Sequence, residues 1–101
     1  MSASIAIQIL PQADSDEEIC RIVDEVIAYI DSTGLHYEVS PFETAIEGEN
    51  LDELLEVAKE CQHVAARAGA RKVSSYIKTV FRPQGEVLTI DQKVGKYRKG
   101  L

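Results

Sequence analysis

Four side chains of the kinds that bind small molecules fall on or beside expected strands: Gln8, Phe42, Thr44 and Glu47. A carboxamide, a hydroxyl and a carboxylate exchange hydrogen bonds with a ligand, and an aromatic ring stacks on flat molecules. Each residue also has a structural explanation: glutamine solvates a strand, threonine favours strands, phenylalanine fills cores, and Glu47 stands before a turn. The residue types leave a shared binding site and four separate structural roles open.

No set of residues indicates catalysis or a metal. The two cysteines and two histidines are scattered, and no glycine-rich phosphate loop is present. Cys20 and Cys61 form no CxxC pair, and Cys61 with His63 offers too few ligands for zinc. We expect reduced, half-buried thiols, and a protein that is not an enzyme and carries no metal or cofactor.

Length and composition fit one globular domain over residues 1–101, with 45% hydrophobic and 28% charged residues. The net charge of −6 argues against a nucleic-acid partner. It is mildly compatible with a cationic small ligand, but a role in solubility alone is the simpler explanation. No apolar run is long enough to cross a membrane and the N-terminus lacks the basic start of a signal peptide, so a cytoplasmic location is expected.

Hydrophobic alternation predicts strands at residues 4–10, 35–40, 43–48 and 71–81. In the first strand, Ile5, Ile7 and Ile9 form one branched apolar face, and Pro11 ends it. Pro41 and Phe42 fit a tight hairpin connection between the second and third strands.

Three capping boxes predict where helices begin: Ser15 with Glu18, Asn50 with Glu53 and, more weakly, Thr89 with Gln92. Gly34 and Gly69 end the two long helices. The first helix carries an apolar stripe of Ile19, Ile22, Val23, Val26, Ile27 and Ile30. The second is expected to bury Leu51, Leu54, Leu55, Ala58, Cys61, Ala65 and Ala68.

The resulting order, β-α-β-β-α-β with an appended helix, predicts an α+β, ferredoxin-like fold with an antiparallel sheet. Both long helices cover one face of the sheet and leave the other bare. Either self-association or the appended helix would cover that bare face. Three functions of this fold are excluded, because the loop at residues 11–14 has neither the arginine of acylphosphatases nor a metal-binding CxxC, and the first strand has no aromatic residue for RNA.

The stretch from Tyr37 to Glu49 contains Thr-Ala-Ile-Glu-Gly and is followed by Leu-Asp-Glu-Leu at residues 51–54. Most specifically in these residues, and more loosely over nearly the whole chain, the sequence resembles the thiamine-binding protein family. The chain departs from the family where Arg82 is followed by a Pro-Gln-Gly turn. Looser matches are Ser4 to Pro11, His63, Gly69, Arg71, Val73, Ile77, Lys78, Lys93 and Val94.

The resemblance implies sheet-to-sheet dimers that pair into tetramers, and binding of thiamine or its hydroxymethyl-aminopyrimidine half without turnover, in salvage or uptake. Glu47 and Gln8 would then pair with the pyrimidine edge and Thr44 would add a hydroxyl. Phe42 or Tyr76 would stack on the ring, and an acidic or aromatic surround would tolerate the thiazolium charge. Glu47 is expected to be an exposed carboxylate in direct contact with the ligand.

A structural or regulatory homo-oligomer that binds another planar ligand or a protein partner is the alternative function. An enzyme ranks third, because no nucleophile, catalytic base or metal site stands out.

Overall fold

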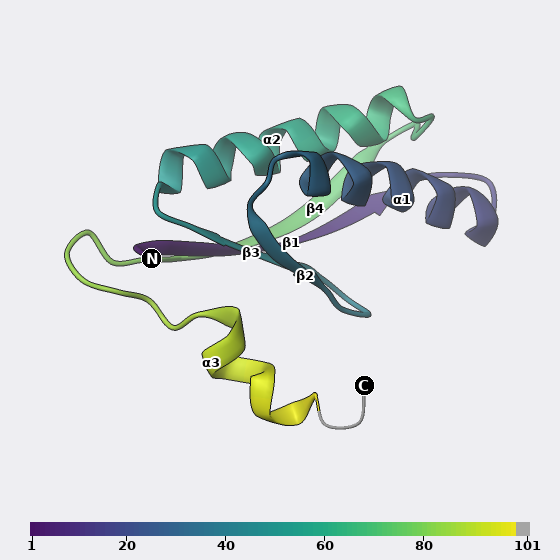
Figure 1. Cartoon of the computed structure of the whole chain (residues 1–101). Coiled ribbons are helices and arrows are strands. Elements are labelled where there is room, and N and C mark those ends of the chain that lie inside the picture. The colour runs from purple at the N-terminus through teal and green to yellow at the C-terminus, as the bar shows by residue number, and fades with distance from the viewer. Residues whose placement is uncertain (99–101) are drawn as a thin grey trace.

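The computed structural model describes residues 1–98 and has the expected element order. The four strands form one antiparallel sheet in the order β2-β3-β1-β4, with α1 and α2 together on one face, which is the ferredoxin-like arrangement (Figure 1). The observed strands differ from the predicted ones by one or two residues at their ends. The elements are β1 (Ala3–Pro11), α1 (Asp16–Ser32), β2 (His36–Val39), β3 (Thr44–Gly48), α2 (Leu51–Arg67), β4 (Val73–Phe81), α3 (Ile90–Val94) and a 3-10 turn (Gly95–Tyr97).

The central strand β1 is longer than one of its two neighbours. It pairs with β4 along its whole length, from Ala3 opposite Phe81 to Pro11 opposite Val73. Its pairing with β3 stops at Ile7, opposite Thr44. Residues 8–11 of β1 therefore have a strand neighbour on one side only.

The core lies between the sheet and the two long helices. Ile5 and Ile7 of β1 and Ile46 of β3 point into it and are almost completely buried. The helices start as predicted, because Ser15 Oγ accepts from the Glu18 N–H and Asn50 Oδ1 accepts from the Glu53 N–H. Their buried residues are Ile22, Val26 and Ile30 of α1 and Leu54, Val57, Ala58, Cys61 and Ala65 of α2.

The burial of Leu55 and of the two cysteines differs from the prediction. Leu55 is 41% exposed, and Val57 takes its place in the core. The stripe that faces the sheet is centred on Leu54 and Ala58, so Leu55 is turned about 100° away from it. Cys20 is exposed rather than half-buried, while Cys61 is fully buried, and both thiols are free.

The appended helix α3 lies on the opposite face of the sheet from α1 and α2 (Figure 1). Its Thr89–Gln92 pair, which looked weaker in the sequence, is the one capping box among residues 1–98 with both reciprocal hydrogen bonds. Val87 and Ile90 are buried, and the Val87 N–H donates to the Met1 carbonyl. This helix covers the face next to β2 and β3 and leaves Leu10, Tyr76 and Val80 exposed.

Within residues 1–98, no helix combines the length and the apolar character needed to cross a membrane.

Candidate functional site

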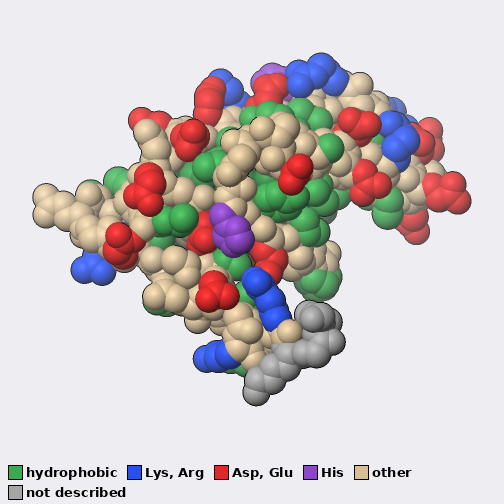
Figure 2. Space-filling view, viewed as in Figure 1, with side chains coloured by type: hydrophobic (Ala, Val, Ile, Leu, Met, Phe, Trp, Pro, Cys, Tyr) green, Lys and Arg blue, Asp and Glu red, His purple; other side chains and the backbone are tan. Residues whose placement is uncertain are grey.

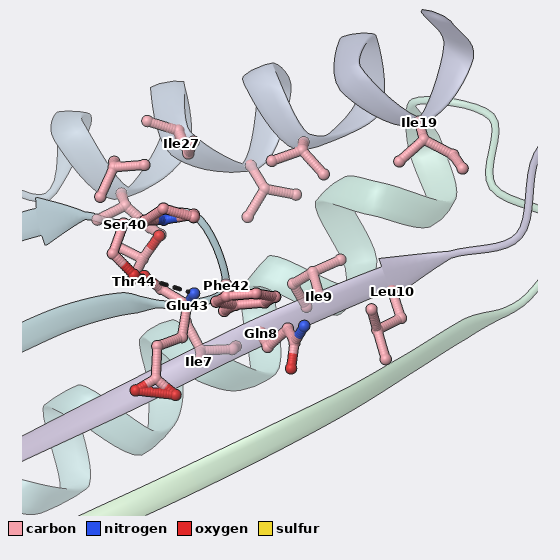
Figure 3. Close-up of a pocket in the computed structure, with 15 residues that line it drawn as sticks. Ile7, Gln8, Ile9, Leu10, Ile19, Ile27, Ser40, Phe42, Glu43 and Thr44 are labelled. Atoms are coloured by element: carbon pink, nitrogen blue, oxygen red, sulfur yellow. Dashed lines mark hydrogen bonds between the residues drawn. The ribbon is translucent and has the colours of Figure 1, made fainter. Parts of the chain in front are cut away.

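A groove of about 230 Å³ lies between α1, the end of β1 and the hairpin that joins β2 to β3. It exists because β3 begins at Thr44, so no strand fills the space beside the last residues of β1. Isoleucines from both elements line it, among them Ile9 of β1 and Ile19 and Ile27 of α1 (Figure 3). The site is therefore mainly apolar, and its few polar groups set what it can recognise.

The hairpin tip is a tight turn held by Ser40. The Ser40 hydroxyl donates to the Glu43 carbonyl at 2.6 Å, and the Glu43 N–H donates to the Ser40 hydroxyl at 3.2 Å. A further backbone bond runs from the Ser40 N–H to the Glu43 carbonyl. The turn holds Phe42 at the mouth of the groove with its side chain 78% exposed, so Phe42 is not a core residue.

Thr44 lies inside the groove. It is 8% exposed and shares the helix-covered face of the sheet with Ile7, its partner on β1. Among residues 1–98, no side-chain hydrogen bond uses its hydroxyl. The hydroxyl is therefore free to exchange hydrogen bonds with a small molecule in the groove; that Thr44 contacts a ligand stays a prediction.

Gln8 lies at the sheet edge, and its carboxamide points away from the isoleucines of α1 (Figure 3). It borders the groove and also a shallow depression on the other face, together with Tyr76 and Lys78. There the Lys78 ammonium forms an ion pair with Glu43 at 2.8 Å. Gln8 can therefore contact a ligand from the open face at the edge of the groove.

Glu47 does not line the groove. It lies three residues beyond Thr44 along β3, on the face that α3 covers, and is only 4% exposed. Its Oε2 accepts from the Ile90 N–H at 2.7 Å, and its Oε1 lies 3.8 Å from His36 Nε2. The expectation of an exposed carboxylate at the strand end is wrong because α3 docks over it; direct ligand contact by Glu47 stays a prediction.

Two polar residues of the groove were missed by the sequence analysis. Ser40 and Glu43 shape the hairpin tip, whereas the sequence marked that turn by Pro41 and Phe42. Among residues 1–98, no three histidine, cysteine, aspartate or glutamate side chains come together to hold a metal ion.

The surface around the groove is apolar with acidic groups at its border. In Figure 2, hydrophobic side chains gather between α1 and the β2–β3 hairpin, and acidic side chains flank them. Such a surface suits a flat, partly apolar ligand that carries a positive charge.

The sequence profile of a family described as thiamine-binding protein matches residues 5–98. A UPF0045 protein of Clostridium perfringens is 42% identical over 97 residues, which is 96% of this chain and 98% of that protein. Among solved structures, a domain of unknown function from Bacillus cereus shares 39% identity at a TM-score of 0.84, covering 98% of this chain and 92% of that one. A protein from Thermotoga maritima, described as a candidate thiamine biosynthesis or salvage protein, shares 30% identity at 0.80, covering 97% and 100%.

Proposed function

The chain belongs to the thiamine-binding protein family, and on that premise we propose that it binds thiamine, or its hydroxymethyl-aminopyrimidine half, without turnover. The observation that carries the proposal is the apolar groove beneath α1, with the Thr44 hydroxyl inside it and the Phe42 ring at its mouth. A few convergent polar groups in an apolar hollow are what fixes a small ligand in place.

The size of the groove favours the pyrimidine as the buried half. Pockets for drug-sized ligands span about 300–1,000 Å³, and this groove holds about 230 Å³. A single six-membered ring fits it better than a whole two-ring molecule. The cationic thiazolium would then lie at the mouth, where the exposed face of Phe42 offers a cation–π contact.

The proposal extends to assembly and cellular role. The face that α3 leaves open exposes Leu10, Tyr76 and Val80, and a second copy would cover them, giving a dimer that pairs into a tetramer. A role in thiamine salvage fits the name of the Thermotoga protein. We extend the proposal to a role in uptake and to the cytoplasm, as expected from the sequence.

Titration calorimetry with thiamine and with the hydroxymethyl-aminopyrimidine tests the binding proposal. Thr44→Val keeps the branched shape and removes the hydroxyl, so affinity should fall about three- to tenfold, as for one lost hydrogen bond. Thr79→Val, on the exposed part of β4, is the matched control and should bind as the parent does. Absence of binding heat with both ligands would overturn the proposal.

The exposed apolar patch on the open face favours a second candidate, a homo-oligomer whose role is structural or regulatory. This candidate predicts assembly in the absence of thiamine and no change in melting temperature when thiamine is added. A ligand that binds only the folded state must raise the melting temperature, so one thermal scan separates the two candidates.

A further inference from the structure

Backbone hydrogen bonds just beyond the two ends of β1 show which of its residues face β4 and which face β3. The Gln12 N–H donates to the Lys72 carbonyl at 2.8 Å, and the Arg82 N–H donates to the Ser2 carbonyl at 2.9 Å. Even-numbered residues of β1 therefore turn their backbone groups toward β4. Alternate residues of a strand point their N–H and C=O to opposite edges, so odd-numbered residues turn toward β3.

Ile9 is the first odd-numbered residue of β1 that lies beyond the start of β3 and so has no partner there. The pairing with β3 ends at Ile7 opposite Thr44, and within residues 1–98 no hydrogen bond outside the strand ladders uses the backbone of Ile9. The next odd-numbered residue, Pro11, has no N–H to donate. Ile9 is half-buried and borders the apolar groove, so its N–H and C=O form an unsatisfied donor–acceptor pair at the site.

We propose, building on the proposed function, that the backbone N–H and C=O of Ile9 recognise the edge of a planar heterocycle with a ring nitrogen beside an amino group. The ring nitrogen accepts from the Ile9 N–H, and the amino group donates to the Ile9 carbonyl. The ligand thereby takes the position that the next residue of β3 would occupy in the ladder. An aminopyrimidine has this edge, whereas a thiazolium does not.

The same pair of hydrogen bonds should exclude a pyrimidine that carries an oxo group in place of the amino group. Replacing the amino group by an oxo group turns a donor into an acceptor and protonates the neighbouring ring nitrogen, so both hydrogen bonds are lost. A bound ring covers the Ile9 N–H and C=O from water, so an analogue that leaves them unpaired is strongly disfavoured. We expect the 4-oxo analogue of the pyrimidine to bind at least about tenfold more weakly than the 4-amino compound.

Amide hydrogen exchange, read residue by residue by NMR, tests the contact without a mutation. In the free protein the Ile9 amide should exchange much faster than the amides of Gln8 and Leu10, which face β4. Saturating pyrimidine should slow Ile9 at least about tenfold. Calorimetric binding with no protection of Ile9 would overturn this inference and leave the proposed function standing; no binding at all would overturn both.

A proline substitution removes the donor. Ile9→Pro deletes an N–H that the β4 ladder does not use, so the sheet can form. Ile9→Ala is the matched control, because it shortens the side chain more and keeps the N–H. We expect at least about tenfold weaker pyrimidine binding for the proline variant than for the alanine variant; equal affinities would refute the contact.

If the Ile9→Pro variant does not fold, a backbone ester provides a second test of the same contact. A synthetic segment of residues 1–19 can be ligated to residues 20–101, because Cys20 supplies the N-terminal cysteine that the ligation needs. An ester in place of the Ile9 N–H changes one atom and leaves the side chain intact. The ester protein should show the same loss of affinity relative to a ligated amide control, and unchanged affinity would refute the proposal.

Discussion

At the scale of single residues, Glu47 shows how one carboxylate can join the two faces of a domain. It sits on β3, yet its hydrogen bond goes to the first residue of α3, 43 positions away. A buried charged acceptor on a backbone N–H typically contributes about 1.5–3 kcal/mol. Glu47 therefore ties the C-terminal helix to the sheet.

Glu47→Ala should lower the free energy of unfolding by about 1–3 kcal/mol, because it leaves the Ile90 N–H buried without an acceptor. The urea midpoint measures this. Glu56→Ala removes an exposed ion pair with Lys59 on α2 and should change the midpoint little. Equal midpoints for the two variants would contradict the role given to Glu47.

Glu47→Gln tests whether Glu47 contacts the ligand or only holds α3 on the sheet. If the groove is the site, this variant binds thiamine as the parent does, since Glu47 does not line the groove. If Glu47 contacts the ligand directly, affinity falls about tenfold, as expected for a lost charge-assisted bond. Calorimetry on the variant decides between them.

The two cysteines should differ sharply in reactivity. Burial raises the pKa of the Cys61 thiol from 9.0 to about 12, whereas Cys20 is exposed. Iodoacetamide at pH 8 should therefore modify one thiol in the native protein and two after unfolding. Mass spectrometry gives the number of modified thiols per chain. Two rapid modifications in the native state would contradict this burial.

The same pKa gives a pH dependence of stability. The unfolded chain releases the Cys61 proton near pH 9 and the folded chain only near pH 12. The folded-state advantage is complete below pH 9 and is lost as the pH rises from 9 toward 12. The loss should be smaller in Cys61→Ala, measured by urea unfolding at pH 8 and pH 10.5.

At the scale of elements, the helix starts follow from local chemistry. Ser15 and Asn50 each accept one of the N–H groups that a helix leaves unpaired at its first turn. Replacing either by alanine should cost about 1 kcal/mol of stability, and the two costs should add because the caps belong to different helices. Unchanged urea midpoints would mean that the caps contribute nothing.

Local signals predicted the elements but not how they meet. The caps and the alternation in β1 depend on residues a few positions apart, so the sequence could reveal them. The exposure of Leu55 depends on how α2 is rotated against the sheet, and the burial of Glu47 depends on where α3 docks. Both are decided by contacts between distant segments, which no local pattern encodes.

The groove could not be predicted from the sequence, because it too depends on how distant segments pair. Thr44 and Phe42 were named as candidates from their types and from the family resemblance, and the structure places both at the groove. The groove itself comes from a difference in length between β1 and β3. A backbone N–H and C=O look the same at Ile9 as at any other residue, so only the strand register shows that they lack a partner.

At the scale of the whole molecule, α3 divides the open face of the sheet into two parts. It covers β2 and β3, where Ile90 is buried and Arg98 forms an ion pair with Glu38. The part over β1 and β4 stays exposed. A domain of this size buries a limited share of its own apolar surface, so covering the exposed part with a second copy would add stability that the monomer lacks.

The double variant Tyr76→Glu and Val80→Glu tests this assembly. Both side chains lie on the exposed part of β4, 68% and 52% exposed, so new charges there should barely disturb the monomer fold. In a symmetric dimer the same patch faces itself, so the charges introduced in one copy face those of the other and like charges repel. Light scattering at micromolar concentration should show a dimer or tetramer for the parent and a monomer for the variant. Leu55→Glu, at an apolar position that is 41% exposed on the helical side, is the control and should keep the mass of the parent. A monomeric parent would refute self-association through this face. A variant that keeps the mass of the parent would place the interface elsewhere on the molecule.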